Sequence, residues 1–301
     1  MELRHLRAFV AVAEERHFSR AAARLHLSQP PLSQQIQALE AELGVRLFER
    51  GRAGVRMTAA GDTLFPHALA LLDQLQRAAE LTRRAGRGES GNLAIGFAGS
   101  MPFSELMPRL LREFRAAWPQ VELQLREQPS RAQIDDLLAR RLDLGFIRPT
   151  RHDRLDALQT RVLQREPLLA AVPESHTLAG RARIRLQELR DDGFIVYSAT
   201  LGSALRDHTL ALCRRAGFEP RIAQDVHEMP TLVGLVAAGI GVGLVAASMR
   251  HSASPWVRYL ELDDPGAHSD IVLAWRRDDT SPVVANFLAL ATPVRALPDA
   301  E

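Results

Sequence analysis

Apolar residues in the first sixty positions recur with the period of amphipathic helices. One helix is expected to bury a face made of Leu32, Ile36, Leu39 and Leu43. These residues are spaced by four, three and four positions, which is the repeat of one side of an α-helix. A shorter, alanine-rich helix is expected over residues 19–25, just before it, and Ser19 and Ser28 are the expected N-caps of the two helices. Two such helices joined by a tight turn are typical of a helix-turn-helix.

The face opposite the apolar one carries amides and hydroxyls instead of the charges of an ordinary solvated helix. Such groups can bond base edges and phosphate oxygens, so this helix is expected to read DNA. Proline is tolerated in the first turn of the helix, where the N–H groups have no intrahelical acceptor. A surface helix of a small helical bundle is the alternative interpretation. The residues expected to contact DNA are Ser28, Gln29, Pro30, Pro31, Ser33, Gln34 and Gln37, joined by Arg50 and Arg52 from the segment that follows.

That following segment has the pattern of a basic β-hairpin. Residues 45–49 and 55–57 are short strand candidates, the glycine-bounded stretch 51–54 is a turn, and Thr58 is the expected cap of a new helix. Arginines are spread along the hairpin, where they can meet phosphates or enter a minor groove. Helices followed by a basic hairpin predict a winged helix-turn-helix.

These residues resemble the LysR-type transcriptional regulators of bacteria. The resemblance covers residues 1–65, and two positions depart from the family pattern: Gln34 and Ala53 stand where family members often carry arginine, although Arg52 lies beside Ala53. The matching residues are Leu3, Phe9, Val12, Ala13, Phe18, Ser19, Ala21, Ala22, Leu25, Ser28, Gln29, Pro30, Leu32, Ser33, Ile36, Leu39, Glu40, Leu43, Gly44, Leu47, Phe48, Arg50, Thr58, Ala60 and Gly61. The resemblance implies double-stranded DNA and a small-molecule effector as partners.

One long helical pattern runs from Thr58 to about Gly86 and is interrupted only by Pro66, which is expected to kink it. Its apolar positions repeat every seven residues, the signature of a coiled-coil seam that needs a partner helix. The seam consists of Leu64, Ala68, Leu71, Leu75, Ala78 and Thr82. A single helix docked on its own domain would show the same stripe. With the family resemblance, we expect a homodimer or homotetramer.

Beyond a polar, glycine-rich hinge at residues 83–91, strand and helix patterns alternate, which predicts an α/β domain covered on both faces of its sheet. The resemblance implies a periplasmic-binding-protein-like (type II) fold with two subdomains and an effector between them. The expected domains are 1–58 for the winged helix-turn-helix, 59–88 for the linker helix and 89–301 for the effector domain. Subdomain I is expected at about 89–162 and 268–301, and subdomain II at about 163–267.

Several loops at strand ends offer groups that suit an acidic ligand. Ser100 and Ser130 each follow a strand and precede a helix, where hydroxyl and N–H groups converge, although both can equally be simple N-caps. Arg148 can pair with an anion or form an ordinary salt bridge. The expected effector contacts are Ser100, Met101, Ser130, Arg148, Thr200, Leu201, Gly202 and His227. A carboxylate or aromatic acid is the expected ligand class.

Other features restrict the choice of function. Cys213 is the single cysteine and lies in an apolar helix, so a buried thiol is expected and paired-cysteine redox sensing is excluded. Gly239–Gly243 follows a helix and enters a strand, which indicates a tight turn and not a phosphate loop. No metal site, catalytic motif, cofactor motif, signal peptide or membrane span is expected, and the protein is expected to be cytoplasmic. The competing hypothesis is a solute-binding or enzymatic α/β protein dimerised by its N-terminal helices.

Overall fold

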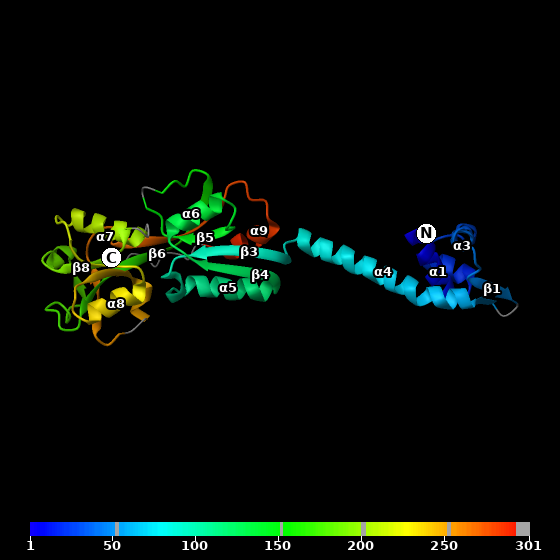
Figure 1. Ribbon diagram of the computed structural model, residues 1–301, viewed down its shortest axis with the longest axis horizontal. Helices are drawn as coiled ribbons and strands as arrows, with labels where there is room; N and C mark the ends of the chain where they lie inside the picture. The colour runs from blue at the N-terminus through cyan, green and yellow to red at the C-terminus, as the bar shows by residue number, and fades with distance from the viewer. Residues whose placement is uncertain (52–53, 151–152, 200–202, 252–253, 293–301) are drawn as a thin grey trace. The chain divides into compact units, whose positions relative to one another are not determined.

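The computed structural model describes residues 1–51, 54–150, 153–199, 203–251 and 254–292, which form two compact units (Figure 1). The first unit is Met1–Arg84 and the second is Ala85–Glu301. No helix in the described part of the chain is long and apolar enough to cross a membrane.

The first unit contains three helices, a hairpin and a long helix. Its elements are α1 (Leu3–Glu15), α2 (Phe18–Arg24), α3 (Gln29–Leu43), β1 (Phe48–Gly51), β2 (Gly54–Met57) and α4 (Ala59–Gly86). Phe9, Phe18 and Phe48 pack together in its core, and Leu32, Ile36 and Leu39 of α3 are fully buried beside them. The antiparallel pairing of β1 with β2 confirms the predicted wing. Helix α4 continues through Pro66 to Gly86.

Three local expectations in this unit are wrong, the first being the bounds of the first wing strand, which runs from Phe48 to Gly51 and not over residues 45–49. Ser19 is not an N-cap, because α2 begins at Phe18 and the ring of His17 accepts the hydrogen bond of the Ser19 N–H at 3.2 Å. Leu43, expected on the buried face of α3, is 41% exposed because α3 ends there, past the part of the helix that packs on the core. Ser28 does stand at the N-cap of α3, but its side chain makes no capping bond.

The second unit is an α/β structure built on a mixed sheet. Its strands run in the order β4-β3-β5-β12-β6-β11-β7, with β10 also paired to β6, and β8 and β9 form a separate parallel pair. The strands are β3 (Ser90–Phe97), β4 (Gln120–Glu127), β5 (Leu144–Ile147), β6 (Leu158–Pro173), β7 (Arg183–Ile184), β8 (Gly193–Tyr197), β9 (Arg221–Val226), β10 (Gly243–Ala246), β11 (Val257–Leu262) and β12 (His268–Arg276). The α-helices are α5 (Leu106–Ala117), α6 (Ser130–Leu138), α7 (Ala204–Arg215), α8 (Met229–Ala237) and α9 (Pro282–Leu290). Short 3-10 helices include η1 (Met101–Phe103), η2 (Leu186–Leu189) and η4 (Ala247–His251).

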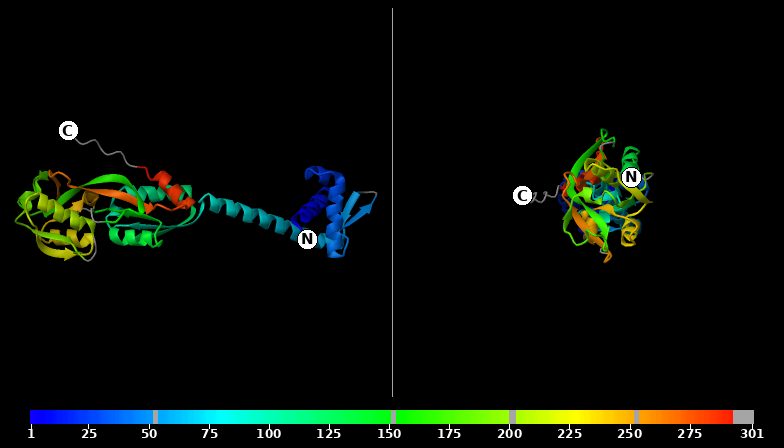
Figure 2. Two further views of the ribbon diagram at one scale, coloured as in Figure 1. Left: turned by 90° about the horizontal axis from the view of Figure 1, so that it is seen from above. Right: turned by 90° about the vertical axis from the view of Figure 1, so that its left-hand side faces the viewer.

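Hydrophobic cores divide this unit into two lobes that lie side by side along β6 and β12 (Figure 2). In the first lobe α5 and α9 cover one face of the sheet around Phe114, Phe146 and Phe287, while α6 covers the other face. The second lobe has its own core, which includes Leu168 and Phe194. Leu163 belongs to the first core and Leu168 to the second, so β6 passes from one lobe to the other between them.

β6 is sixteen residues long, whereas the sequence predicts a strand only over 168–172. Residues 158–167 include several exposed positions and end with Glu166 and Pro167, so they lack the continuous apolar run of residues 168–172. The sequence predicts a helix over 103–118, but α5 begins only at Leu106, because η1 occupies the preceding turn.

The glycine turn at 239–243 is a site of close backbone packing, as predicted. A Cβ at Gly241 would lie 2.2 Å from the carbonyl oxygen of Gly193, and the neighbouring Val242 bonds both Gly193 and Ile195. We expect Gly241→Ala to lower the free energy of unfolding by about 1–3 kcal/mol, the range for overpacked sites. Denaturant unfolding measures this.

Gly234→Ala is the matched control, since Gly234 lies on α8 and a Cβ there would meet no neighbouring atom within 4 Å. Alanine favours a helix over glycine, so this variant should be as stable as the wild type or more stable. Equal stability of the Gly241 and Gly234 variants would contradict the close-packing explanation.

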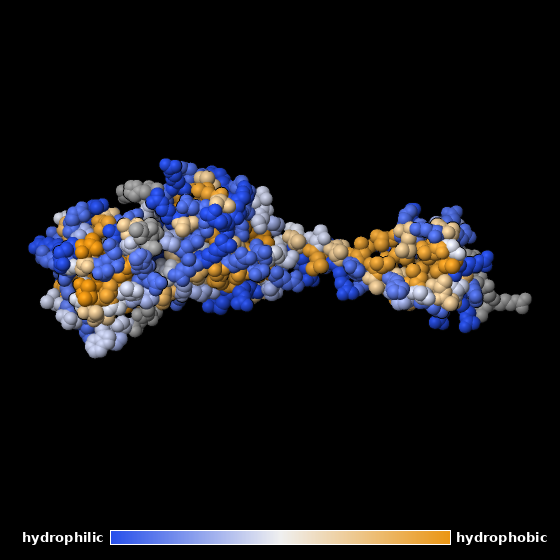
Figure 3. Space-filling model, viewed as in Figure 1, coloured by the Kyte–Doolittle hydropathy of each residue, from blue (hydrophilic) through white to orange (hydrophobic). Residues whose placement is uncertain are grey.

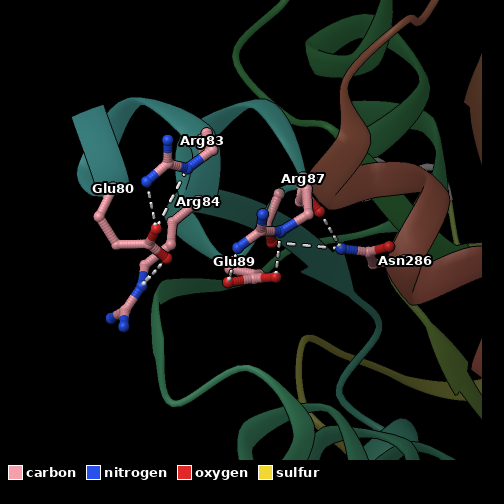
Figure 4. Close-up of polar contacts among 7 residues, drawn as sticks. Glu80, Arg83, Arg84, Arg87, Glu89 and Asn286 are labelled. Atoms are coloured by element: carbon pink, nitrogen blue, oxygen red, sulfur yellow. Dashed lines mark hydrogen bonds and ion pairs between the residues drawn. The ribbon is translucent and has the colours of Figure 1, made fainter. Parts of the chain in front are cut away.

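Where the two units meet in the sequence, each makes its own polar contacts (Figure 4). In α4, Glu80 pairs with Arg83 and Arg84. In the second unit, the Asn286 amide of α9 donates to the carbonyl oxygens of Arg87 and Gly88, at 2.9 and 3.2 Å. A Cβ at Gly88, whose φ is +68°, would lie 2.6 Å from the carbonyl carbon of Pro282. The segment entering β3 is therefore fixed on α9.

Candidate DNA and effector sites

The exposed side of α3 carries the side chains expected to contact DNA. Ser28, Gln29, Pro30, Gln34 and Gln37 are exposed. Pro31 and Ser33 are partly buried. These residues make up the N-cap and the first turns of α3, the part of a recognition helix that contacts base edges in helix-turn-helix proteins.

Glu40 of α3 holds the hairpin against this helix. Its carboxylate accepts from the N–H groups of Leu47 and Phe48, at 2.7 and 3.2 Å. The Thr58 hydroxyl donates to the Arg46 carbonyl at 2.7 Å and accepts from the Gly61 N–H, which confirms Thr58 as the cap of α4. Glu40 and Thr58 thus hold the wing in a fixed position relative to α3. The sequence pattern does not reveal this role of Glu40.

The basic character of the wing comes from arginines on both strands and from Arg46, which precedes β1. Arg46 and Arg56 are exposed. The expected contacts Arg50, through its side chain, and Arg52 lie outside the described residues, as does Ala53.

Arg148 connects three of the segments expected to bind an effector. It follows β5 and is 4% exposed. Its backbone N–H donates to the Ser130 hydroxyl at 3.0 Å, and its Nε donates to the Ser100 hydroxyl at 3.3 Å. The structure therefore brings Ser100, Ser130 and Arg148 together, although these residues are up to 48 positions apart in the sequence.

Glu166 completes this cluster, and no feature of the sequence marks it as a site residue. The carboxylate, 2% exposed on β6, forms a buried ion pair with Arg148 Nη2. Its other oxygen accepts from the Ser248 N–H of η4 at 2.7 Å. Since η4 packs with the second lobe, the chain of bonds from Arg148 through Glu166 to Ser248 joins the two lobes.

Arg148 keeps one hydrogen-bonding group free. Its Nη1 is buried and has no hydrogen-bond partner in the described structure. An unsatisfied charged donor in a protein interior is costly, so a group that accepts its bond would be stabilised there. The Arg148 cluster, defined as Ser100, Ser130, Arg148 and Glu166, therefore has the chemistry of an anion site with one open position.

The remaining effector candidates fall into different places. Ser130 is the first residue of α6 and its hydroxyl serves Arg148, so it is not the cap of that helix. Met101 is a core residue, fully buried, with its N–H bonded to Ala98; it has neither side chain nor N–H to offer a ligand. His227 follows β9 and is exposed. Thr200, Leu201 and Gly202 lie outside the described residues.

Two titratable groups of the second lobe are influenced by the Arg148 charge. Burial raises the pKa of Tyr197 above its ordinary value, and Arg148 opposes this shift. Burial, followed by the charge of Arg148, lowers the pKa of His208, whose Nδ1 is buried without a partner in the described structure. The phenol and the imidazole are therefore both neutral at physiological pH.

Apolar residues gather on the surface of the first unit, beside α1 and along α4 (Figure 3). A groove of about 450 Å³ is lined by Met1, Glu2, Leu3, Leu6, Leu71, Gln74, Leu75 and Ala78, and is called the α1–α4 groove below. The heptad stripe therefore has two parts. Ala68 is fully buried in its own unit, whereas Leu71 is 45% exposed in the groove.

Cys213 is buried in the second lobe, as expected, and burial raises the pKa of its thiol to about 12. Among the described residues, no three histidine, cysteine or acidic side chains converge in the way a metal ion requires.

Comparison with known proteins assigns both units. Residues 3–62 match the family of bacterial regulatory helix-turn-helix proteins of the lysR type, and residues 86–295 match the LysR substrate binding domain. The chain is 42% identical over 288 residues to YnfL of Escherichia coli (strain K12), named an uncharacterized HTH-type transcriptional regulator, covering 95% of this chain and 96% of that protein. It is 38% identical over 291 residues to the HTH-type transcriptional regulator AlsR of Bacillus subtilis (strain 168), covering 97% and 95%. The crystal structure of full-length CbnR complexed with its target DNA superposes with a TM-score of 0.82 at 31% identity, covering 97% of this chain and 98% of that one.

Proposed function

The chain belongs to the LysR family of DNA-binding transcriptional regulators with an effector-binding domain, and we propose that an acidic small molecule at the Arg148 cluster controls its DNA binding. The unpartnered Nη1 of Arg148 is the observation that carries this proposal. A carboxylate is the ligand group that suits an arginine fork, because it accepts charge-assisted hydrogen bonds. The Ser100 hydroxyl, which is only partly buried, adds a second polar contact.

We propose that effector binding acts through the bonds that join the lobes. A carboxylate near Arg148 competes with Glu166 for the guanidinium, and Glu166 also holds the Ser248 N–H of the second lobe. An effector that binds one arrangement of the lobes more tightly than another shifts the protein toward that arrangement. We also propose the domain boundaries expected from the sequence. The DNA-binding domain ends at residue 58 and the linker helix at residue 88, and the chain passes between the two subdomains at about 162–163 and 267–268.

For DNA, we propose that the N-terminal turns of α3 enter the major groove and that the wing arginines contact phosphates. Gln34 and Gln37 would act with Ser33 as the base-reading side chains. CbnR, whose structure is similar to that of this chain, was solved in complex with its target DNA, which supports DNA as the partner. The protein would then act in the cytoplasm, where bacterial DNA lies, as a regulator and not as an enzyme.

Two copies of the chain are proposed to pair through the α1–α4 groove. The groove is apolar and lies on the part of the heptad stripe that its own unit leaves exposed. A helix with such a stripe reaches stability by packing against a second helix. A homodimer or a homotetramer built from such pairs would present two recognition helices to one DNA site.

A gel-shift titration of the full chain tests the DNA contacts. We expect selection from randomised duplex DNA to yield a preferred sequence, and Gln34→Ala to weaken binding to it by about tenfold, the loss typical of a specific base contact. Binding to unrelated DNA should stay the same. Gln76→Ala, an exposed amide on α4, is the control and should bind like the wild type. Equal weak binding of the wild type to every sequence would refute the proposal.

A further inference from the structure

A second buried polar group without a partner lies on β12, beside the Arg148 cluster. Ser269 is 1% exposed, and its hydroxyl makes no hydrogen bond within the described structure. In the antiparallel pairing of β12 with β6, Ser269 stands directly opposite Glu166. Side chains of directly opposite residues project from the same face of a sheet, with Cβ atoms about 4.5–5.5 Å apart. The Ser269 hydroxyl is therefore close to the carboxylate that holds Arg148.

The next pair along the two strands supports this register. Arg165 and Asp270 also stand opposite each other, and their side chains meet at 3.1 Å. Neighbouring residues of a strand alternate between the two faces, so this ion pair lies on the other face of the sheet. Arg165 is exposed there, whereas Glu166 and Ser269 are both buried. The strand pairing thus brings Glu166 and Ser269 together on the covered face.

The Glu166 carboxylate is directed at other groups in this arrangement. One of its oxygens pairs with Arg148 Nη2, and the other accepts from the Ser248 N–H at 2.7 Å. An ionised carboxylate is only an acceptor, and a serine hydroxyl can donate to it. A buried hydroxyl without a bond costs free energy, so an arrangement that turns a Glu166 oxygen toward Ser269 gains that bond.

We infer that Ser269 is a positioning residue that receives the Glu166 carboxylate when an acidic effector takes Arg148. A buried carboxylate that loses its guanidinium is costly unless another donor reaches it. Ser269 supplies that donor from the neighbouring strand. The Arg148 cluster then has two hydrogen-bonded arrangements, one with Glu166 on Arg148 and one with Glu166 on Ser269. The inference rests on the proposed effector site and adds how that site exchanges its partners.

A double-mutant cycle tests this exchange without any effector, because Arg148→Met takes the guanidinium away from Glu166. In the wild type, Ser269→Ala should leave stability unchanged or raise it, since the hydroxyl has no bond to lose. In the Arg148→Met chain, Ser269→Ala should lower the folding equilibrium constant by about tenfold or more, the strength of a hydrogen bond to a charged group. Denaturant unfolding of the four full-length chains measures the coupling.

Tyr259→Phe is the matched control for this cycle. The Tyr259 hydroxyl is also buried without a partner in the described structure, but it belongs to β11, where Tyr259 stands opposite Ala171 and not Glu166. Its removal should show no coupling to Arg148→Met. If Ser269→Ala has the same effect on stability in the wild type and in the Arg148→Met chain, Ser269 does not receive Glu166 and the inference is overturned.

Titration with benzoate and with adipate, followed by the melting temperature, tests the exchange in full-length chains that keep Arg148. We expect Ser269→Ala to bind the active acid about tenfold more weakly than the wild type does, because the displaced carboxylate lacks its new donor. Tyr259→Phe should bind it like the wild type. Equal binding by Ser269→Ala and the wild type overturns the inference and leaves the effector site standing. A wild type that responds to neither acid contradicts the proposed effector, and the double-mutant cycle then decides the role of Ser269 by itself.

Discussion

Arg148→Met should abolish the response to acidic effectors and lower the free energy of unfolding by about 3–5 kcal/mol, the cost of breaking a buried ion pair. The variant leaves the Glu166 carboxylate buried with the Ser248 N–H but without its guanidinium. It also removes the Nη1 donor that an effector would use. Denaturant unfolding measures the first effect. Thermal shifts of the full chain with a panel of aromatic and dicarboxylic acids measure the second.

Two further variants separate stability from ligand binding. Replacing both partners, Arg148→Met with Glu166→Leu, removes the uncompensated charge and should recover most of the lost stability. Effector binding should not return, because the arginine is still missing. Arg258→Met is the matched control, since Arg258 pairs with Glu174 at the surface, where an ion pair contributes little. An Arg148→Met chain that still shifts its melting temperature with the same acids as the wild type would rule out the Arg148 cluster as the effector site.

Much of the fold follows from local patterns in the sequence. The buried residues of α3 and the hairpin after it are set by spacing within fifteen residues or by turn residues next to them, so both are predicted. The same holds for β4, β9 and β11, which the sequence predicts over 121–127, 221–226 and 257–262, within one residue of the observed bounds. The pattern of apolar and polar residues within each of these elements is enough to predict it.

The Arg148 cluster depends on residues that are far apart in the chain. Ser100, Ser130 and Arg148 are recognisable as polar groups at strand ends, but their mutual bonds are not. Glu166 lies in the part of β6 that passes between the lobes, and a lone carboxylate before an apolar run gives no sign of a buried partner eighteen residues earlier. The cap of α2 shows the same limit, because serine has the stronger general preference for that position while the local backbone places His17 there.

Leu71→Asp should convert the protein to monomers and weaken binding to its DNA site by about 100-fold or more. A charge in the α1–α4 groove would have to be buried against a second copy without a partner, which opposes association. Losing the second DNA-binding motif removes the effective concentration that bivalent binding supplies, commonly a factor of about 10²–10⁴. Sedimentation velocity gives the assembly state, and gel shifts with the selected sequence give the affinity.

Leu81→Asp makes the same chemical change on the same helix but outside the groove. Leu81 is 60% exposed and does not belong to the heptad stripe, so this variant should stay assembled and bind DNA like the wild type. Because Leu71 and Leu81 both lie at exposed positions of α4, neither change should unfold the chain, and thermal melting checks this. If Leu71→Asp remains a dimer with unchanged affinity, the exposed part of the heptad stripe is not the surface through which two copies pair. If both variants dissociate, the pairing surface extends along α4 beyond the groove.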